Sequence, residues 1–438
     1  MRHVAIIGGG FSGTLQAVGL LRHGSARVTL IERAGRLARG AAFSTRNPEH
    51  LLNVRAAAMS ALPDQPCHFA DWLTANGGGD TESFAQRRAY GTYVQQLLKD
   101  VMAEAGDRLV VIEGEAVDVR GGRDGETVML ADGRAIAADA VILSVGNLAP
   151  EVPRGIAEAG LEGGVYIADP WAGDIAAGLG RDDNVLLLGT GLTAIDAALI
   201  LDAAGFRGRI VALSRRGLVP RAHADPAPAA PRDAVPEPRC SALLRSVRAD
   251  AESLGWRAAV DRLRPVTQAL WAAAAPTQRR RFLRHMRPWW DVHRHRIAPE
   301  IAAALERMEA DGRLVFRAGK LLDVRPSGDG AAICWRPRAT DEAEPLHVRR
   351  IVNCTGPQGN VARAPEPLLA SLLAAGRIRP DPCRIGIDVD ADCRTLDAGS
   401  EASGSLFAIG PMTRGTFWEI VAVPDIRVQV DSLARRLS

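Results

Sequence analysis

The sequence predicts an α/β protein that contains two copies of one strand–turn–helix unit, together with a helical insertion. The pattern G-x-G-x-x-G/A occurs in HVAIIGGGFSGTLQAVGLL near the N-terminus and again in NVLLLGTGLTAIDAALIL. Each copy follows a short apolar run, typical of a buried parallel strand, and opens an apolar, alanine-rich helix. A chain of 438 residues is also long enough for two or three domains.

Each glycine of the pattern has its own physical task in a Rossmann-like dinucleotide-binding domain. The first lets the strand turn into the helix, and the second lets the backbone approach a pyrophosphate. The third lets helix and strand pack closely, and alanine, here Ala194, is also accepted there. The pyrophosphate then lies on the free N–H groups of the helix start. A glycine-rich turn without a ligand is the alternative for each copy. The candidate cofactor-binding residues are Gly8, Gly10, Ser12 and Gly13 in the first copy and Gly189, Gly191 and Thr193 in the second.

The residues that follow each copy separate the two cofactors. The strand after the first copy ends at Glu32 and Arg33, and a carboxylate there accepts hydrogen bonds from an adenosine ribose and repels a 2′-phosphate. FAD and NAD therefore fit the first site. The strand after the second copy ends at Arg215 and Arg216, without an acid. Arginine forks match a 2′-phosphate, and two charged hydrogen bonds favour NADPH over NADH by roughly a hundredfold or more. Two solvated surface arginines are the alternative.

Composition changes along the chain predict three domains. We expect a discontinuous first domain over 1–155 plus 312–438, to which the predicted strands near 314–316 and 331–336 and the segment HVRRIVNCTGPQG return. The second Rossmann unit is expected over 156–225. The remaining 226–311 begins with the Pro/Ala-rich HADPAPAAPRDAVPEP and continues with helical spacing, which predicts a helical insertion or lid.

The helical insertion carries a basic cluster that includes RRRFLRHMRPWWDVHRHR. A solvated helix face explains most of these charges, and the alternative for a minority is that they face an anionic ligand or the nicotinamide cofactor. His223 and the segment 289–295 are candidates to cover a pocket, with packing and surface roles as alternatives. We do not infer a nucleic-acid partner from this cluster.

Composition and cysteine spacing exclude several classes. The net charge of +3 is modest, and no apolar run is long enough for a membrane span. The first strand begins near His3, which leaves no room for a signal peptide, so we expect a cytoplasmic protein. The six cysteines form neither C-x-x-C nor a metal-ligand spacing, which argues against a dithiol reductase and against a metal site. We expect reduced, mostly buried cysteines, and the oligomeric state stays open.

The chain resembles a bacterial family of FAD/NAD(P)-binding proteins related to flavin-containing and N-hydroxylating monooxygenases. The segments that carry the resemblance are GGGFSG, PEHLLNVRAAAMS, GTGLTAIDAAL with ALSRRGL, RPWWDVHRHR, VNCTGP and the C-terminal GP-x-TRG. The resemblance implies a two-dinucleotide-binding flavoprotein fold with FAD in the first site and a nicotinamide cofactor in the second, where Arg215 and Arg216 favour NADPH over NADH. It also implies that Gly146 and Gly356 are crossover points between the domains.

The resemblance also assigns residues near the flavin. Asn53 is expected to hydrogen-bond near the reactive edge of the flavin or near the nicotinamide, and an Asx turn is the equally weighted alternative. The C-terminal turn with Gly410, Thr413 and Gly415 is expected near the flavin, with the following helix directed at its O2. This chain has Pro411 where such flavoproteins usually have an aspartate, so one carboxylate near the ribityl chain is lost.

The predicted function is an FAD-dependent oxidoreductase that uses NADPH, in particular a monooxygenase acting on a small molecule. No catalytic base is required, because the flavin carries the chemistry and the protein supplies orientation and a dry pocket. A histidine usual in the related monooxygenases is missing from EGGVYIADPW. Two alternatives are therefore retained: an NAD(P)H-dependent flavin reductase or oxidase, and a flavin-binding redox sensor with little turnover.

Overall fold

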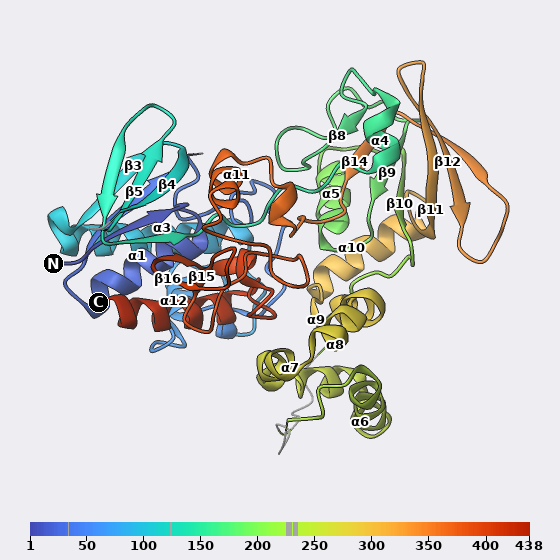
Figure 1. The fold of residues 1–438 in the computed structure, drawn as a ribbon. Helices are drawn as coiled ribbons and strands as arrows, with labels where there is room; N and C mark the ends of the chain where they lie inside the picture. The colour runs from blue at the N-terminus through green and yellow to red at the C-terminus, as the bar shows by residue number, and fades with distance from the viewer. Residues whose placement is uncertain (34, 123–124, 225–229, 231–234) are drawn as a thin grey trace.

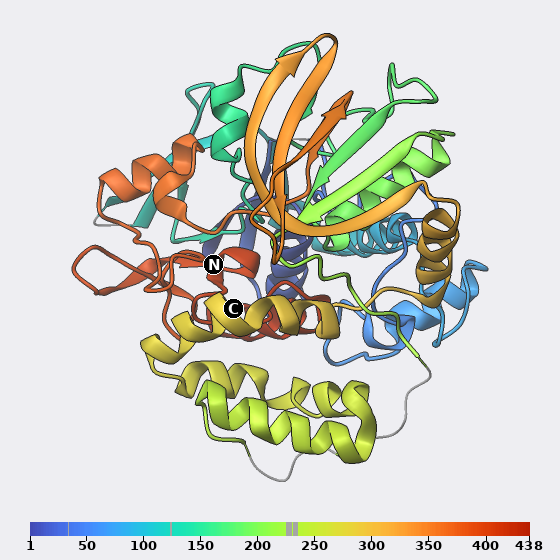
Figure 2. The ribbon, with the colours of Figure 1, turned by 90° about the vertical axis from the view of Figure 1, so that its right-hand side faces the viewer.

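Two α/β domains stand side by side, and a helical segment lies beneath them in Figure 1. The computed structural model describes residues 1–33, 35–122, 125–224, 230 and 235–438. Figure 2, turned by 90°, shows the helical segment again below both domains. The Pro/Ala-rich part of the expected lid, residues 225–229 and 231–234, lies outside the described residues.

The first domain is built on a six-stranded sheet in the order β15-β16-β7-β1-β2-β3. All neighbours are parallel except β15 and β16. Apolar runs such as VAII in β1 are buried because both faces of the sheet are covered. The strands are β1 (His3–Ile7), β2 (Arg27–Glu32), β3 (Leu109–Glu113), β7 (Ala140–Leu143), β15 (Arg394–Leu396) and β16 (Ala402–Ala408).

Helices cover one face of this sheet, and a small antiparallel sheet with a short helix covers the other. The helices on the first face are α1 (Phe11–His23), α2 (His68–Ala75), α3 (Arg87–Ala105) and α12 (Val423–Leu437). The elements on the second face are β4 (Ala116–Gly122), β5 (Gly125–Leu130), β6 (Ala135–Ala138) and α11 (Pro367–Ala374). The 3₁₀ turns of this domain are Ala56–Ala58, Gly106–Arg108, Val361–Arg363 and Gly410–Thr413.

The second domain has a seven-stranded sheet in the order β13-β12-β11-β10-β9-β14-β8. Its parallel part carries α5 (Leu192–Ala203) and α10 (Pro299–Ala310) on one face and α4 (Arg154–Ala159) on the other. The long β11 continues beyond β10 into an antiparallel hairpin with β12. The strands are β8 (Tyr166–Ile167), β9 (Asn184–Leu188), β10 (Arg209–Ser214), β11 (Leu314–Ser327), β12 (Gly330–Pro337), β13 (Glu344–Val348) and β14 (Arg350–Asn353).

The expected return of the chain to the first domain at residue 312 needs correction. Strand β11 pairs with β10 and β14 pairs with β9, so residues 314–353 complete the second sheet and not the first. Helix α10 also packs its apolar face on this sheet instead of joining the helical insertion. The first core resumes with Val361 and Leu368, after β14. Sequence could not separate the two outcomes, because a strand that enters a glycine turn looks the same in either sheet.

The helical insertion packs against the C-terminal tail of the first domain. The indole Nε1 of Trp271 donates to the carbonyl oxygen of Gly415 at 2.8 Å, and Arg264 pairs with Asp425. In the part of the chain that the structure describes, no helix has the length and apolarity needed to cross a membrane. The elements of the helical insertion are α6 (Cys240–Asp261), a 3₁₀ turn (Arg264–Val266), α7 (Thr267–Ala273), α8 (Pro276–Arg281), a π-helical turn (Phe282–Met286) and α9 (Arg287–Arg294).

Candidate cofactor sites and the cleft between the domains

The turn from β1 into α1 requires glycine at its first and third positions. Gly8 has φ +103°, and a Cβ there would lie 2.2 Å from the carbonyl oxygen of Ser144 at the end of β7. A Cβ on Gly13 would lie 1.9 Å from the carbonyl oxygen of Gly8. Any other residue at either position would push backbone atoms apart, so both glycines are explained by the fold itself.

The turn from β9 into α5 repeats this geometry in the second domain. Gly189 has φ +128°, and a Cβ there would lie 2.3 Å from the carbonyl oxygen of Cys354, which follows β14. Ala194, in the place of the third glycine, is buried against the sheet. Each first glycine therefore approaches the end of the strand next to its own, β7 in one domain and β14 in the other.

Packing within the fold does not require glycine at the middle position of either copy. Gly10 and Gly191 are the N-cap residues of α1 and α5, with φ −70° and −86°, values that any residue adopts. A Cβ on Gly10 would make only an ordinary contact, 3.5 Å from Cα of Gly40, and a Cβ on Gly191 would meet nothing within 4 Å. The missing side chains leave space in front of the first N–H groups of each helix. This space fits a pyrophosphate on both helix starts.

Glu32 lies at the first glycine turn, as a ribose partner must. Its Oε2 accepts a hydrogen bond from the N–H of Gly9 at 2.8 Å, at the end of β2. Arg33, the next residue, instead pairs with Glu115 at 3.2 Å on the surface, where 57% of its side chain is exposed. The structure therefore brings Glu32 to the candidate site and leaves Arg33 outside it.

The C-terminal turn docks against the start of α1. Gly410 has φ +75°, and a Cβ there would lie 2.7 Å from Oγ of the buried Ser12. The turn is held by Gln429 of α12, which accepts from the N–H of Gly410 at 2.8 Å and donates to Oγ1 of Thr413 at 3.0 Å. Ser12, Gly410 and Thr413 thus come together. Helix α12, however, begins only at Val423 and does not follow this turn directly, as the sequence interpretation had it.

Three further glycines of the predicted site have different surroundings. Gly146 and Gly356 have φ +70° and +81°, and nothing lies within 4 Å of a Cβ built on either one. Gly356 lines the cleft described next. A Cβ on Gly415 would lie 2.4 Å from Cγ of Asp381, and its carbonyl oxygen accepts from Trp271. Gly415 therefore serves the contact between the tail and the helical insertion.

A cleft of about 830 Å³ opens where the second glycine turn, the first domain and α9 meet. The second domain contributes the turn with Gly189, Gly191 and Thr193, and also Arg215, Arg216 and Gly356. The other two walls carry polar side chains, which are Asn53, Asn147 and Arg414 from the first domain, and Arg287 and Asp291 of α9 with His295 directly after it. One hollow therefore joins the second cofactor turn to both other parts of the protein.

The turn after β10 presents its two arginines to this cleft. Oγ of Ser214 accepts from the N–H of Gly217 at 3.0 Å and lies 2.9 Å from Oγ1 of Thr190, which fixes the turn. Arg215 is exposed and Arg216 half-buried. Neither forms an ion pair with a described residue, so both guanidinium groups are available to an anion.

Asn53 lies on the first-domain wall of the cleft. Its carbonyl oxygen accepts a hydrogen bond from Nε2 of His223 at 3.0 Å, and the His223 ring packs on Phe84 with 4.9 Å between centroids. Burial lowers the pKa of His223, which keeps the ring neutral at pH 7. Within the described chain the Asn53 side chain makes no hydrogen bond, so the alternative Asx turn is not formed. The amide is left facing the cleft.

Arg414 is a half-buried cation on the same wall. Its Nη2 donates to Oδ1 of Asn147 at 3.1 Å, and its Nε donates to the carbonyl oxygen of Pro411 at 3.3 Å. Burial, with the nearby charge of Arg287, lowers its pKa to about 10, so the side chain stays charged at neutral pH. The wall therefore offers amide and guanidinium donors to a polar small molecule.

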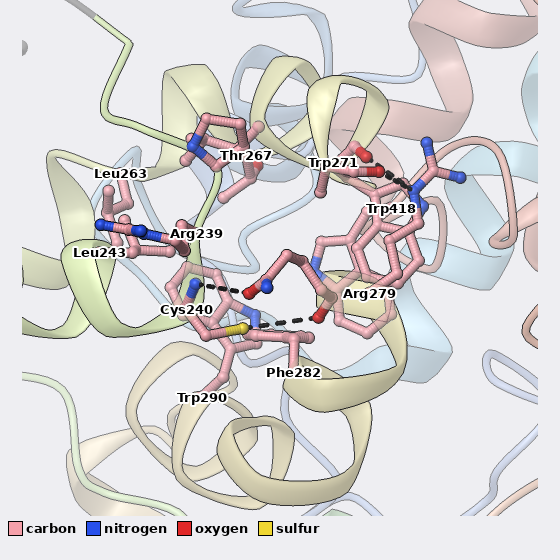
Figure 3. A pocket seen from close by; sticks show the side chains of 14 residues that line it. Arg239, Cys240, Leu243, Leu263, Thr267, Trp271, Arg279, Phe282, Trp290 and Trp418 are labelled. Atoms are coloured by element: carbon pink, nitrogen blue, oxygen red, sulfur yellow. Dashed lines mark hydrogen bonds between the residues drawn. The ribbon is translucent and has the colours of Figure 1, made fainter. Parts of the chain in front are cut away.

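The two faces of α9 serve different cavities. Arg287, Asp291 and His295 line the cleft, whereas Trp290 lines a separate apolar pocket inside the helical insertion (Figure 3). This pocket of about 70 Å³ is walled mainly by Trp271, Phe282, Trp418 and leucine side chains. The Trp290 Nε1 donates to the Glu419 carboxylate at 2.8 Å. One face of α9 therefore lines the cleft, and Trp290 on the other face anchors the helix in the apolar pocket.

Most arginines of the basic cluster have structural partners. Arg279 donates to the carbonyl oxygens of Trp271 and Ala274 at 2.9 and 3.0 Å. Arg294 pairs with Glu419 at 3.1 Å, and Arg296 pairs with Asp261 at 2.9 Å. Arg280, Arg281 and Arg284 are exposed to solvent. Arg287 is the arginine of this cluster that lines the cleft, so the solvated-face interpretation holds for a few and packing explains others.

A buried ion pair that sequence reasoning missed joins the two domains. Arg87, at the start of α3, binds Asp196 of α5 through two hydrogen bonds of 2.7 and 3.1 Å. The Asp196 side chain is 8% exposed. Nε2 of the buried His50 lies 3.1 Å from the Asp196 carbonyl oxygen, and burial lowers the pKa of His50. An aspartate inside the apolar run LTAIDAALIL was the available signal.

Two equivalent glycine turns in separate α/β domains, with the second domain inserted into the first, match the two-dinucleotide-binding fold of flavoproteins. The predicted fold class is therefore confirmed. Residues 5–148 match a family model described as FAD-NAD(P)-binding, which confirms the expected FAD/NAD(P)-binding domain. No curated protein matches the chain by sequence.

Solved structures share the fold over the whole chain at low sequence identity. The ornithine N-hydroxylase of Kutzneria sp. 744 is 16% identical with a TM-score of 0.66, covering 100% of this chain and 99% of its own. The L-lysine 6-monooxygenase of Pseudomonas syringae is 15% identical with a TM-score of 0.67, covering 100% and 99%. The bacillithiol disulfide reductase of Bacillus cereus is 14% identical with a TM-score of 0.60, covering 100% and 98%.

Proposed function

We propose that the chain is an NADPH-dependent FAD oxidoreductase, and specifically a monooxygenase that acts on a small polar molecule. The observation that carries this proposal is the pair of geometrically equivalent glycine turns, the second of which opens into a cleft bounded by both domains. The ornithine N-hydroxylase structure, which contains reduced FAD, NADP+ and L-ornithine, shares this fold. The hydroxylation of a small polar molecule is compatible with a cleft that is lined by polar side chains and bounded by both domains.

The residues present fit the two cofactors. FAD would lie on the start of α1, with Gly10 leaving room for the pyrophosphate, Glu32 binding the ribose and the turn at Gly410 and Thr413 beneath it. NADPH would lie on the start of α5, with Gly191 leaving room for the pyrophosphate and the arginines after β10 holding the 2′-phosphate. When bound, FAD supplies the redox chemistry, accepting a hydride from NADPH and passing the electrons to oxygen.

The side chains of the cleft orient the reacting molecules and exclude water. Asn53 presents an amide from one wall, Arg414 presents a guanidinium beside it, and α9 closes the opposite wall. Burial lowers the pKa of His295 and raises the pKa of Asp291, so a neutral histidine and a weakened acid face the cleft. A neutral imidazole and a carboxylate can each accept a hydrogen bond from a polar substrate, and either can also accept a proton.

A flavin reductase or oxidase is the runner-up. It is favoured by the segment EGGVYIADPW around β8, which contains no histidine. Within this segment Asp169 accepts a hydrogen bond from the N–H of Trp171 at 2.9 Å. A dithiol mechanism is disfavoured, because Cys354 is the one cysteine lining the cleft in the described structure and burial raises its pKa far above the usual range. All six cysteines are free thiols, which supports our further proposal of a cytoplasmic location. Of the six, only Cys354 and Cys393 are buried, fewer than the sequence predicts.

Oxygen uptake coupled to NADPH consumption tests the proposed function. The purified protein should release FAD on denaturation, and a screen of amines, thiols and ketones should find compounds that stimulate both NADPH oxidation and oxygen uptake. Hydrogen peroxide in a one-to-one ratio to NADPH with every compound would favour the oxidase. A strict need for another electron acceptor would favour the reductase, and no steady turnover would favour a redox sensor.

Asn53→Ala should uncouple the reaction without loss of FAD. The amide donates to the reacting molecules from the cleft wall, and one lost hydrogen bond is worth about 1 kcal/mol, or roughly fivefold. We expect more hydrogen peroxide per NADPH, measured in a peroxide assay, at unchanged flavin content. The exposed Asn76→Ala is the control. An unchanged peroxide yield in Asn53→Ala would remove Asn53 from the catalytic site.

Replacing both Arg215 and Arg216 with Gln should weaken NADPH much more than NADH. Loss of two charged hydrogen bonds weakens the binding free energy of NADPH by roughly 3 kcal/mol or more, about a hundredfold in affinity. NADH has no 2′-phosphate, so its binding does not depend on these contacts. The concentration dependence of anaerobic flavin reduction measures both cofactors. Arg209→Gln, at the opposite end of β10, is the control. Equal losses for both cofactors would contradict the assignment.

A further inference from the structure

A basic hollow adjoins the cleft at the end of β10. Its volume is about 560 Å³, and it is formed by the hairpin of β11 and β12 together with Arg215. Arg215, Gly319 and Lys320 line both the hollow and the cleft, so the two adjoin at these residues. Any cofactor that reaches Arg215 from the second glycine turn therefore also reaches this hairpin.

The charges of this hollow are not balanced by the protein. Four cations line it, Arg215, Lys320, Arg336 and Arg338, against a single carboxylate, Asp341. Within the described ranges none of these five side chains takes part in an ion pair. Farther along β11, the strand of Lys320, Arg325 forms an ion pair with Asp323 at 2.7 Å, so the lack of ion-pair partners is local to the hollow.

The strand register places two of the cations directly opposite each other. In the antiparallel ladder Lys320 pairs with Arg336, and the neighbouring Trp335 points into the core. Like charges at directly opposed positions destabilise a sheet. Because β10 pairs with β11 so that Ser214 lies opposite Ala318, Lys320 stands beside the turn that carries Arg215. An anion bound between these residues would offset their repulsion.

We propose that Lys320 and Arg336 complete the 2′-phosphate site of NADPH together with Arg215, and that the adenosine end of the cofactor extends from the cleft into this hollow. The inference rests on the proposed function and adds specificity-determining residues to it. A 2′-phosphate carries up to two negative charges and accepts several charge-assisted hydrogen bonds, which matches a cluster of unpaired cations. The pyrophosphate has its own place on the N–H groups of α5.

The test measures binding of 2′,5′-ADP and 5′-ADP to the flavin-loaded protein by calorimetry, independently of turnover. Lys320→Gln and Arg336→Gln should each weaken 2′,5′-ADP by about tenfold or more and leave 5′-ADP within about twofold. Arg325→Gln, on the same strand, should change neither probe. The melting temperature of ligand-free Lys320→Gln should equal or exceed that of the original protein, because a repulsion is relieved. If Lys320 only stabilised the sheet, its replacement by Gln would lower the melting temperature.

The other outcomes overturn the proposal in distinguishable ways. If the original protein prefers 2′,5′-ADP and the two hairpin variants retain that preference, the hairpin is not the 2′-phosphate site, and the proposed function stands. Equal weakening of both probes would show a site for phosphate in general. If the original protein binds neither probe, the proposed NADPH-dependent function fails, and this inference fails with it.

Discussion

Gly10→Val is expected to leave a folded protein that contains no FAD. The backbone at Gly10 tolerates any residue, and a new Cβ meets only Gly40 at ordinary contact distance, so the fold has no reason to fail. The branched side chain would instead occupy the space in front of the α1 N–H groups, where the pyrophosphate must lie. Denaturing release followed by chromatography measures FAD content, and circular dichroism checks the fold.

Matched variants separate this effect from general damage. Gly191→Val should retain FAD and lose flavin reduction by NADPH, because the same space is filled at the second turn. Gly173→Val, where a Cβ also meets nothing within 4 Å, should change neither property. Stoichiometric FAD in Gly10→Val would contradict the assignment of FAD to the first turn.

Asp196→Ala is expected to destabilise the protein by about 3–5 kcal/mol, the usual result of removing one partner of a buried ion pair. Arg87 would be left partly buried without its carboxylate, at the junction of α3 and α5. The free energy of unfolding from urea titration measures the loss. Glu158→Ala, from the pair with Arg154 in which both side chains are largely exposed, should cost less than about 1 kcal/mol.

The double variant Arg87→Met with Asp196→Leu sharpens this prediction. Because it removes both charges, it should be considerably more stable than Asp196→Ala alone. If the single variant unfolds with the same free energy as the original protein, the ion pair is not what joins the two domains at this position.

Local patterns predicted the nucleotide turns, and long-range pairing was beyond them. Gly8 and Gly189 are readable from sequence because the turn, the strand and the helix are adjacent along the chain. The strands within 314–353 belong to the second sheet and not to the first, which the sequence could not decide because either sheet accepts an apolar strand and the choice depends on residues far away. Lys320 was missed for the same reason, since its place beside Arg215 follows from the pairing of β10 with β11.

Residue roles were predictable only in part. Glu32 stands at its turn because a strand end and its glycine loop are fixed together, whereas Arg33 turns to a surface partner that the sequence pattern does not reveal. The basic cluster of the helical insertion gave no means to separate Arg287, which lines the cleft, from Arg279, which binds backbone carbonyl oxygens. Those assignments depend on how the insertion packs against the C-terminal tail.

The central claim is that both nucleotide turns serve one hydride transfer, and anaerobic mixing of the FAD-loaded protein with NADPH tests it most directly. We predict that one equivalent of NADPH bleaches the flavin absorbance completely, and that NADH does so only at far higher concentration. A flavin that stays oxidised while NADPH is shown to bind would contradict the account, because the second turn would then hold a nucleotide that does not reach the flavin.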